Sequence, residues 1–211
     1  AQALDPDDLL VMGFTIDWAA RSGKLDTAIT MQQRLAVRDP LSFVQRSNLG
    51  TYLFAAGRLE DALGELRAAQ ELSRDTPDVG LQIAQILALR GRHEEAMTVI
   101  EGLPAGTLRD LGLALLYRAP GMLEAADQAL ERLTAQPDDT REAIRIAEVF
   151  AARGMDEAAL TRLQALRASL EGDQEAARPM MREFHQELIL SHLLKPLHAD
   201  PRWVALMAGL P

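Results

Sequence analysis

The chain has 211 residues, a net charge of −9 and no cysteine, which excludes disulfides, thiolate catalysis and cysteine-ligated zinc. Its apolar fraction of 48% is that of a folded protein. Acidic residues outnumber basic ones by 31 to 22 with no segregated basic run, so direct binding to nucleic acid is not expected, and no apolar run approaches the roughly 20 residues of a membrane span.

Glycine and alanine recur together at a fixed interval along the chain. Gly23, Gly57 and Gly91 are 34 residues apart, and the rhythm continues at Gly121 and Gly154 after intervals of 30 and 33. An alanine follows each glycine by five residues: Ala28, Ala62, Ala96, Ala126 and Ala159. A repeat of this length predicts one supersecondary unit that is copied and stacked, which favours a binding scaffold over a core with one active site.

Each unit is predicted to be a helix, a tight glycine turn and an antiparallel helix. Apolar residues keep a helical spacing up to Gly91, and a glycine just past the last periodic residue ends a helix because it accepts the left-handed conformation. The first helices of the units are expected at 8–22, 43–56, 77–90, 107–119 and 141–153. The second helices are expected at 25–37, 59–72, 93–103, 122–135 and 156–169.

Helix starts and the two irregular intervals are also marked. Thr76 stands before a proline and is expected to be an N-cap, and Asp139 with Glu142 has the spacing of a capping box. The interval of 30 lacks four residues, close to one helical turn, and we place this loss where Gly102 would end a second helix early. The interval of 33 lacks one residue, which a loop around Pro137 can absorb.

The repeat stops after about residue 170. A longer helix is expected at 175–194, with Pro179 in its first turn, and a short helix is expected after Asp200. Stacks of repeats need atypical ends that shield their last apolar face. We therefore divide the chain into a repeat array at 1–170 and a C-terminal helical cap at 171–211.

The beginning of the chain keeps the phase of the repeat. Ala1 to Pro6 corresponds to Leu35 to Pro40, so these first residues are expected to be the end of an upstream repeat. The N-terminal face of the array would then expose apolar surface through which two copies of the chain pair.

The units resemble the tetratricopeptide repeat. That family pairs a bulky residue with a small one in the first helix, places glycine at the turn and puts alanine early in the second helix. The matching pairs are Leu49 with Gly50, Ile83 with Ala84, Leu113 with Ala114, and Ile146 with Ala147. The first unit departs from the pattern, with Thr15 and Ile16 at these positions. The resemblance implies an all-α, right-handed α-solenoid of about five antiparallel helix pairs.

The end of the chain is similar to a tail that closes many bacterial multidomain tetratricopeptide proteins. This similarity runs from Lys195 to Pro211, with Trp203 where phenylalanine is expected. In those proteins the repeats commonly follow an adenylate-cyclase-like or a winged-helix domain. The similarity implies the C-terminal module of a bacterial regulatory or signalling protein. A chain without cysteine fits the cytoplasm, and a periplasmic location stays open.

The concave groove is the expected binding site. In tetratricopeptide stacks the first helices line this side, and partner peptides lie against it. The register places six polar residues there, beside Leu81, Leu111 and Leu115: Asn48, Thr51, Gln82, Gln85, Arg141 and Arg145. Amides can pair with a peptide backbone, and two arginines one helical turn apart can hold a carboxylate. We expect a non-catalytic scaffold without a cofactor, whose partner is a protein, a peptide or the chain's own N-terminal domain.

The sequence leaves one alternative from another class of function. His185 and His192 lie seven residues apart and can share a helical face, but Leu188 and Ile189 between them cannot bind a metal. No phosphate-binding loop or nucleophile elbow is present. Acidic pairs at the starts of second helices are expected to interact with the helix dipole: Glu60 and Asp61, Glu94 and Glu95, Asp156 and Glu157. The alternative is a small-ligand sensor or a metal-dependent enzyme that uses the groove or the His185/His192 face.

Overall fold

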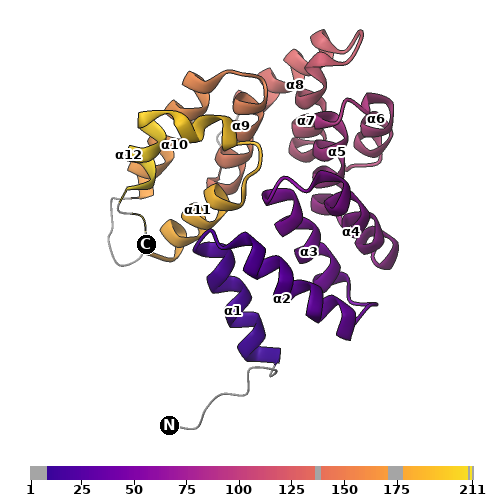
Figure 1. Ribbon diagram of the computed structural model, residues 1–211. Helices are drawn as coiled ribbons and strands as arrows, with labels where there is room; N and C mark the ends of the chain where they lie inside the picture. Colours follow the sequence, from indigo (N-terminus) through magenta and orange to yellow (C-terminus); the bar gives the residue numbers. More distant parts are fainter. Residues whose placement is uncertain (1–8, 136–138, 171–177, 209, 211) are drawn as a thin grey trace.

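The computed structural model describes residues 9–135, 139–170, 178–208 and 210. Within them the chain forms twelve α-helices and two 3-10 helices, with no strand (Figure 1). The expectations for residues 1–6, for the loop around Pro137 and for the beginning of the helix at 175 lie outside these residues.

Helix pairs follow one another along the described chain, and each first helix packs against the second helix of its own pair. The first helices are α1 (Leu9–Arg21), α3 (Phe43–Ala55), α5 (Pro77–Leu89), α7 (Thr107–Ala114), continued by η1 (Leu115–Arg118), and α9 (Thr140–Ala152). The second helices are α2 (Leu25–Arg38), α4 (Leu59–Leu72), α6 (His93–Glu101), α8 (Leu123–Thr134) and α10 (Asp156–Leu170). The predicted all-α stack of helix pairs is therefore confirmed (Figure 1).

Glycine and alanine serve the same two purposes in every pair. The turn glycines adopt the left-handed backbone conformation that side chains disfavour, with φ of 69° at Gly23, 82° at Gly57, 71° at Gly91, 73° at Gly121 and 75° at Gly154. The alanine five residues later is 0% exposed in every case: Ala28, Ala62, Ala96, Ala126 and Ala159. A small side chain at this point lets two antiparallel helices approach closely.

Helix ends follow the sequence signals, with one exception. Helix α6 has nine residues against fourteen in α2, and Gly102 is its C-cap, so the shortening falls where it was placed. The Asp139 carboxylate accepts a hydrogen bond from the Glu142 backbone N–H at 2.8 Å. Thr76 is the N-cap of α5 with Pro77 in the first turn, as expected, but its hydroxyl donates to the Ser73 carbonyl oxygen at 3.0 Å and forms no side-chain cap bond. The preceding helix end supplies an acceptor that competes with capping.

The C-terminal segment does more than cover the last repeat. It forms α11 (Arg178–Leu190), η2 (Lys195–Ala199) and α12 (Pro201–Met207), and both α12 and η2 pack against α10. Helix α11 also contacts α10, and it contacts the first helices α1, α3 and α9, so it lies between the two ends of the stack (Figure 1). Phe184 and Leu188, both 0% exposed, anchor α11 to the core. Pro179 is the second residue of α11, as expected.

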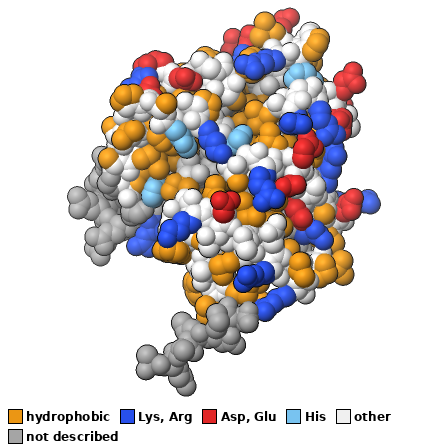
Figure 2. Space-filling model, in the orientation of Figure 1, with side chains coloured by type: hydrophobic (Ala, Val, Ile, Leu, Met, Phe, Trp, Pro, Cys, Tyr) orange, Lys and Arg blue, Asp and Glu red, His pale blue; other side chains and the backbone are white. Residues whose placement is uncertain are grey.

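The core runs along the stack and leaves few polar groups buried without partners. Leu111 and Leu115, which were expected on the groove, are 1% and 7% exposed and belong to this core, whereas Leu81, 2% exposed, belongs to the core and also lines the concave cavity described below. Gln32 is 2% exposed and donates to the backbone oxygen of Gln45 at 3.0 Å, which joins the first pair to the second. On the outer surface shown in Figure 2, acidic and basic side chains are interspersed. No described helix combines the length and the apolarity that a membrane crossing needs.

Candidate functional site

A cavity of about 410 Å³ lies on the concave side of the stack, between α3, α5, α9 and the α11 region. All the polar residues that the register placed in the groove line it: Asn48, Thr51, Gln82, Gln85, Arg141 and Arg145. The remaining wall comes from the C-terminal segment, including Glu187, Ser191 and His192. Sequence reasoning missed this wall because it assigned the segment to the end of the array. The chain's own C-terminal helix therefore closes one side of the groove.

The two arginines already bind carboxylates of the chain itself. Arg145 of α9 forms an ion pair with Asp78 of α5, and the Arg141 guanidinium lies 3.5 Å from the Glu183 carboxylate of α11. The two arginines were expected to hold one carboxylate together. In the structure each guanidinium instead has a separate carboxylate of the chain as its partner. These ion pairs tie α9 to α5 on one side and to α11 on the other.

The amide side chains differ in how well their polar atoms are satisfied. The Thr51 hydroxyl lies 3.1 Å from Gln82 Oε1 and 3.0 Å from the Ser47 carbonyl oxygen, as donor to either. Gln85 is only 6% exposed, lines the cavity, and forms no side-chain hydrogen bond with any residue that the structure describes. The Gln85 amide is therefore available to a molecule that enters the cavity.

Two carboxylic acids of the cavity have perturbed acidities. Burial, together with the nearby charge of Glu187, raises the pKa of Glu148 to about 7, against the opposing effects of the Ser191 hydroxyl, which donates a hydrogen bond to it at 2.5 Å, and of the Arg145 charge. Burial also raises the pKa of Glu187, which the positive charges of Arg141 and Arg145 oppose. Among the described residues, no ion pair joins either carboxylate to a basic side chain. Perturbed acids in a cavity are a feature of functional sites.

His192 lies at the end of the cavity and not in a metal site. Its ring centroid is 5.4 Å from that of Phe54, and its Nδ1 is buried without a hydrogen-bond partner. Burial lowers the pKa of His192, and the charge of Lys195 lowers it further. A Cβ at Gly57 would lie 3.1 Å from His192 Cε1, so the small turn residue makes room for the ring. The part of the chain described here holds no cluster of three His, Cys, Asp or Glu residues placed to bind a metal ion.

A larger depression of about 800 Å³ lies between α2, α3 and α4. Its charged residues pair with one another, since Arg46 lies 2.7 Å from the Glu65 carboxylate and Arg58 lies 2.7 Å from that of Asp61. These pairs leave no charge of the depression in evident need of a ligand. The concave cavity, which contains unpaired polar groups, is therefore the stronger candidate site.

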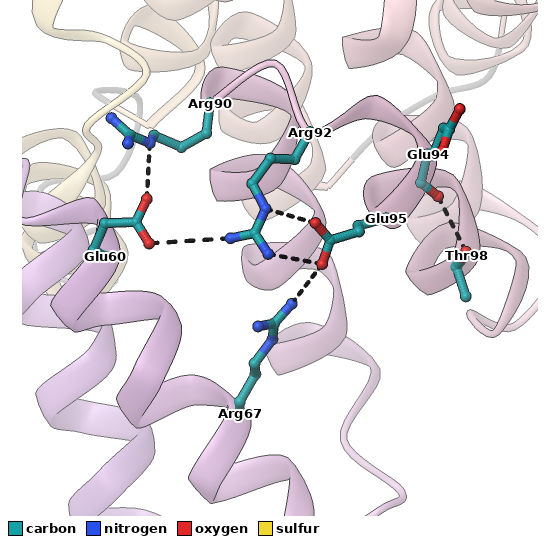
Figure 3. Close-up of polar contacts among 7 residues, drawn as sticks. All are labelled: Glu60, Arg67, Arg90, Arg92, Glu94, Glu95 and Thr98. Carbon is teal, nitrogen blue, oxygen red and sulfur yellow. Dashed lines mark hydrogen bonds and ion pairs between the residues drawn. The ribbon is translucent and has the colours of Figure 1, made fainter.

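Two of the acidic residues at the starts of second helices, Glu60 and Glu95, link neighbouring repeats. Figure 3 shows Arg92, at the turn before α6, between Glu60 of α4 and Glu95 of α6. Its guanidinium lies 2.7 Å from Glu95, which also binds Arg67 of α4 at 3.1 Å. Arg90 completes the network with a distance of 2.8 Å to Glu60. These exposed carboxylates join neighbouring repeats, which accounts for them without any chemistry.

Residues 53–116 match the tetratricopeptide repeat family. The match begins within α3 and ends within η1, so it covers the middle of the array. In structure, the chain is similar to one chain of the solved APC/C hetero-tetramer Cut9-Hcn1, with a TM-score of 0.51 and 16% sequence identity. This match covers 96% of the present chain but only 39% of that chain, so the present chain spans well under half the length of its structural relative. No curated protein matches it significantly. At this identity the likeness shows the fold alone, an all-α array of helix pairs whose middle, residues 53–116, matches the tetratricopeptide repeat.

Proposed function

We propose that the chain is a non-catalytic scaffold that binds a peptide or a domain of a partner protein in the concave cavity. Tetratricopeptide repeats serve generally in protein–protein interaction, and the family match supports this class of function. The observation that carries the proposal is the convergence of polar side chains from three separate helix pairs on one cavity, where the Gln85 amide forms no hydrogen bond with a described residue. Polar groups converging in a concave site are typical of binding sites.

The pairing of the cavity side chains indicates how an extended segment binds. The amides of Asn48 and Gln85 are available to a peptide backbone. Both arginines are paired, so the recognition of a terminal carboxylate by two guanidinium groups is not the preferred mode. The occupant would lie beside α11, which forms the opposite wall.

We further propose that the array at 1–170 and the segment at 171–211 form the C-terminal module of a larger bacterial regulatory or signalling protein in the cytoplasm. The similarity of the tail from Lys195 onwards supports this context. The module's own N-terminal domain is then one candidate occupant of the cavity. Pairing of two copies through the N-terminal face is supported by the exposure of Phe14 and Trp18, which are 74% and 56% exposed on α1.

The test is a selection of peptides from a random display library on the full chain, followed by calorimetry. For selected peptides, replacing both Gln82 and Gln85 with alanine should weaken binding about tenfold or more, because each lost hydrogen bond costs about 1–3 kcal/mol. The matched control is Gln164→Ala, an exposed amide on α10 outside the cavity, which should leave affinity unchanged. If no peptide binds in the cavity while a small metabolite does, the small-ligand alternative replaces the scaffold.

A further inference from the structure

The cavity contains more negative than positive charge. Four carboxylates and two guanidinium groups lie at or beside it: Asp78, Glu148, Glu183 and Glu187 against Arg141 and Arg145. The arginines pair with Asp78 and Glu183. In the described part of the chain this leaves Glu148 with only a neutral hydroxyl and Glu187 without an ion pair. Two carboxylates therefore face the cavity without a paired cation.

We propose that the occupant of this cavity presents a basic side chain, an arginine or a lysine of the partner, which pairs with Glu148 and Glu187. The inference rests on the proposed function and specifies the chemistry of the partner. A cation that enters between two like charges relieves both of them, and in a partly desolvated site this attraction is stronger than in water.

Gln85 provides an independent indication of the same ligand chemistry. Gln85 lies on the cavity wall, is only 6% exposed, and its amide forms no hydrogen bond with a described residue. A guanidinium presents its N–H donors in a rigid planar fork that matches two oxygens of a carboxylate at once, whereas an ammonium is a point charge with three rotatable donors. The cavity volume of about 410 Å³ suits one long side chain and its flanking backbone. Arginine is therefore the preferred basic residue.

The acidities of the two carboxylates make the binding pH-dependent. The groups that face them are Ser191 and Asp78 together with Arg141, Arg145 and Glu183. A bound cation favours the ionised acids and lowers their pKa, so binding releases protons near pH 7, where Glu148 is half-protonated. Affinity for a basic ligand should rise from pH 5.5 to pH 8. At pH 5.5 the carboxyl of Glu148 is protonated and must lose its proton when the cation binds, whereas at pH 8 it is already ionised.

The direct experiment titrates the full chain with N-acetyl-arginine amide and, separately, with N-acetyl-citrulline amide, which has nearly the same shape but no charge. Amide and carboxyl NMR shifts locate each ligand. At pH 8 the arginine amide should bind in the cavity at least about tenfold more tightly than the citrulline amide. Replacing both Glu148 and Glu187 with glutamine should abolish this preference. The control is Glu124→Gln, which removes an exposed carboxylate of α8 and should leave it intact.

Three outcomes would overturn the inference. The two amides could bind equally well, the NMR shifts could lie outside the cavity, or the double glutamine variant could keep the preference for the arginine amide. The peptides from the library selection separate this result from the fate of the scaffold itself. If those peptides bind in the cavity but keep their affinity after arginine is exchanged for citrulline, the basic-ligand inference fails and the scaffold function stands. If no peptide binds in the cavity, the scaffold function fails, whatever the arginine amide does.

Discussion

The buried carboxyl of Glu148 predicts a specific pH dependence of stability. Its pKa is about 7 in the folded protein against an ordinary 4.5, so between these values the folded state binds a proton that the unfolded chain releases. The stabilising effect of that proton is complete below pH 4.5 and is lost as the pH rises through 7. Since one pKa unit corresponds to about 1.4 kcal/mol, the loss amounts to about 3 kcal/mol.

The variant Glu148→Gln removes this titration and keeps an oxygen that accepts the hydrogen bond from Ser191. Between pH 5 and pH 8, the fall in unfolding free energy should be about 2–3 kcal/mol smaller in the variant than in the wild type. Urea unfolding followed by circular dichroism measures this difference at each pH, and equal m-values show that the unfolded states are comparable.

The exposed Glu124 supplies the control, because Glu124→Gln removes the same charge from the surface of α8 and should leave the pH profile of the wild type in place. Any remaining slope in the Glu148 variant belongs to Glu187, whose pKa is raised by burial as well. A Glu148 variant with the same pH profile as the wild type would show that this carboxyl is not held in a desolvated site.

The other predictions concern the stack and its ends. Gly50→Ala should destabilise the protein by about 1–3 kcal/mol, because the added Cβ would lie 2.6 Å from Leu66 Cγ where α3 and α4 cross. In Gly64→Ala the added Cβ meets nothing within 4 Å, so this variant should stabilise the protein by about 0.5–1 kcal/mol. If the melting temperatures of the two variants shift in the same direction, the close crossing of α3 and α4 is contradicted. Arg92→Ala should lower the melting temperature slightly in dilute buffer and not in about 1 M salt, since its ion pairs are exposed. Trp18→Glu should abolish concentration-dependent association on size exclusion, and a wild type that stays monomeric at all concentrations would show that the N-terminal face does not pair.

The repeat array was predictable because each unit ends its first helix with a glycine and packs its second helix through an alanine, at the same positions in every unit. A glycine such as Gly57 ends a helix through its own backbone freedom, and an alanine such as Ala62 lets the next helix approach, so both signals can be read without tertiary information. The shortened α6 was predictable for the same reason, since Gly102 ends it locally. The register of the first helices then placed the polar residues on one side, where the structure brings them into one cavity.

The position of α11 was not predictable from these signals. Its periodicity shows that Phe184 and Leu188 face a core, but a buried stripe does not say which helices cover it. The partners α1 and α3 lie more than a hundred residues earlier in the chain. The perturbed pKa of Glu148 was missed as well, because burial raises it and two residues of this distant segment, Ser191 and Glu187, act on it in opposite directions. The position of α11 and the pKa of Glu148 therefore depend on contacts between distant parts of the chain, which local sequence patterns do not reveal.

The same residues now explain why stability and binding oppose each other in this cavity. A buried carboxyl without a cation destabilises the folded chain, and Glu187 adds a second carboxylate without an ion pair, so folding alone gives no reason to keep Glu148 and Glu187 in one cavity. A basic side chain from a partner would satisfy both groups at once. The groups that lower the stability of the free protein would therefore favour basic ligands over neutral ones in the complex. Glu148→Gln should accordingly stabilise the free chain above pH 7 and weaken its hold on basic ligands, a combination that a purely structural role for this residue does not produce.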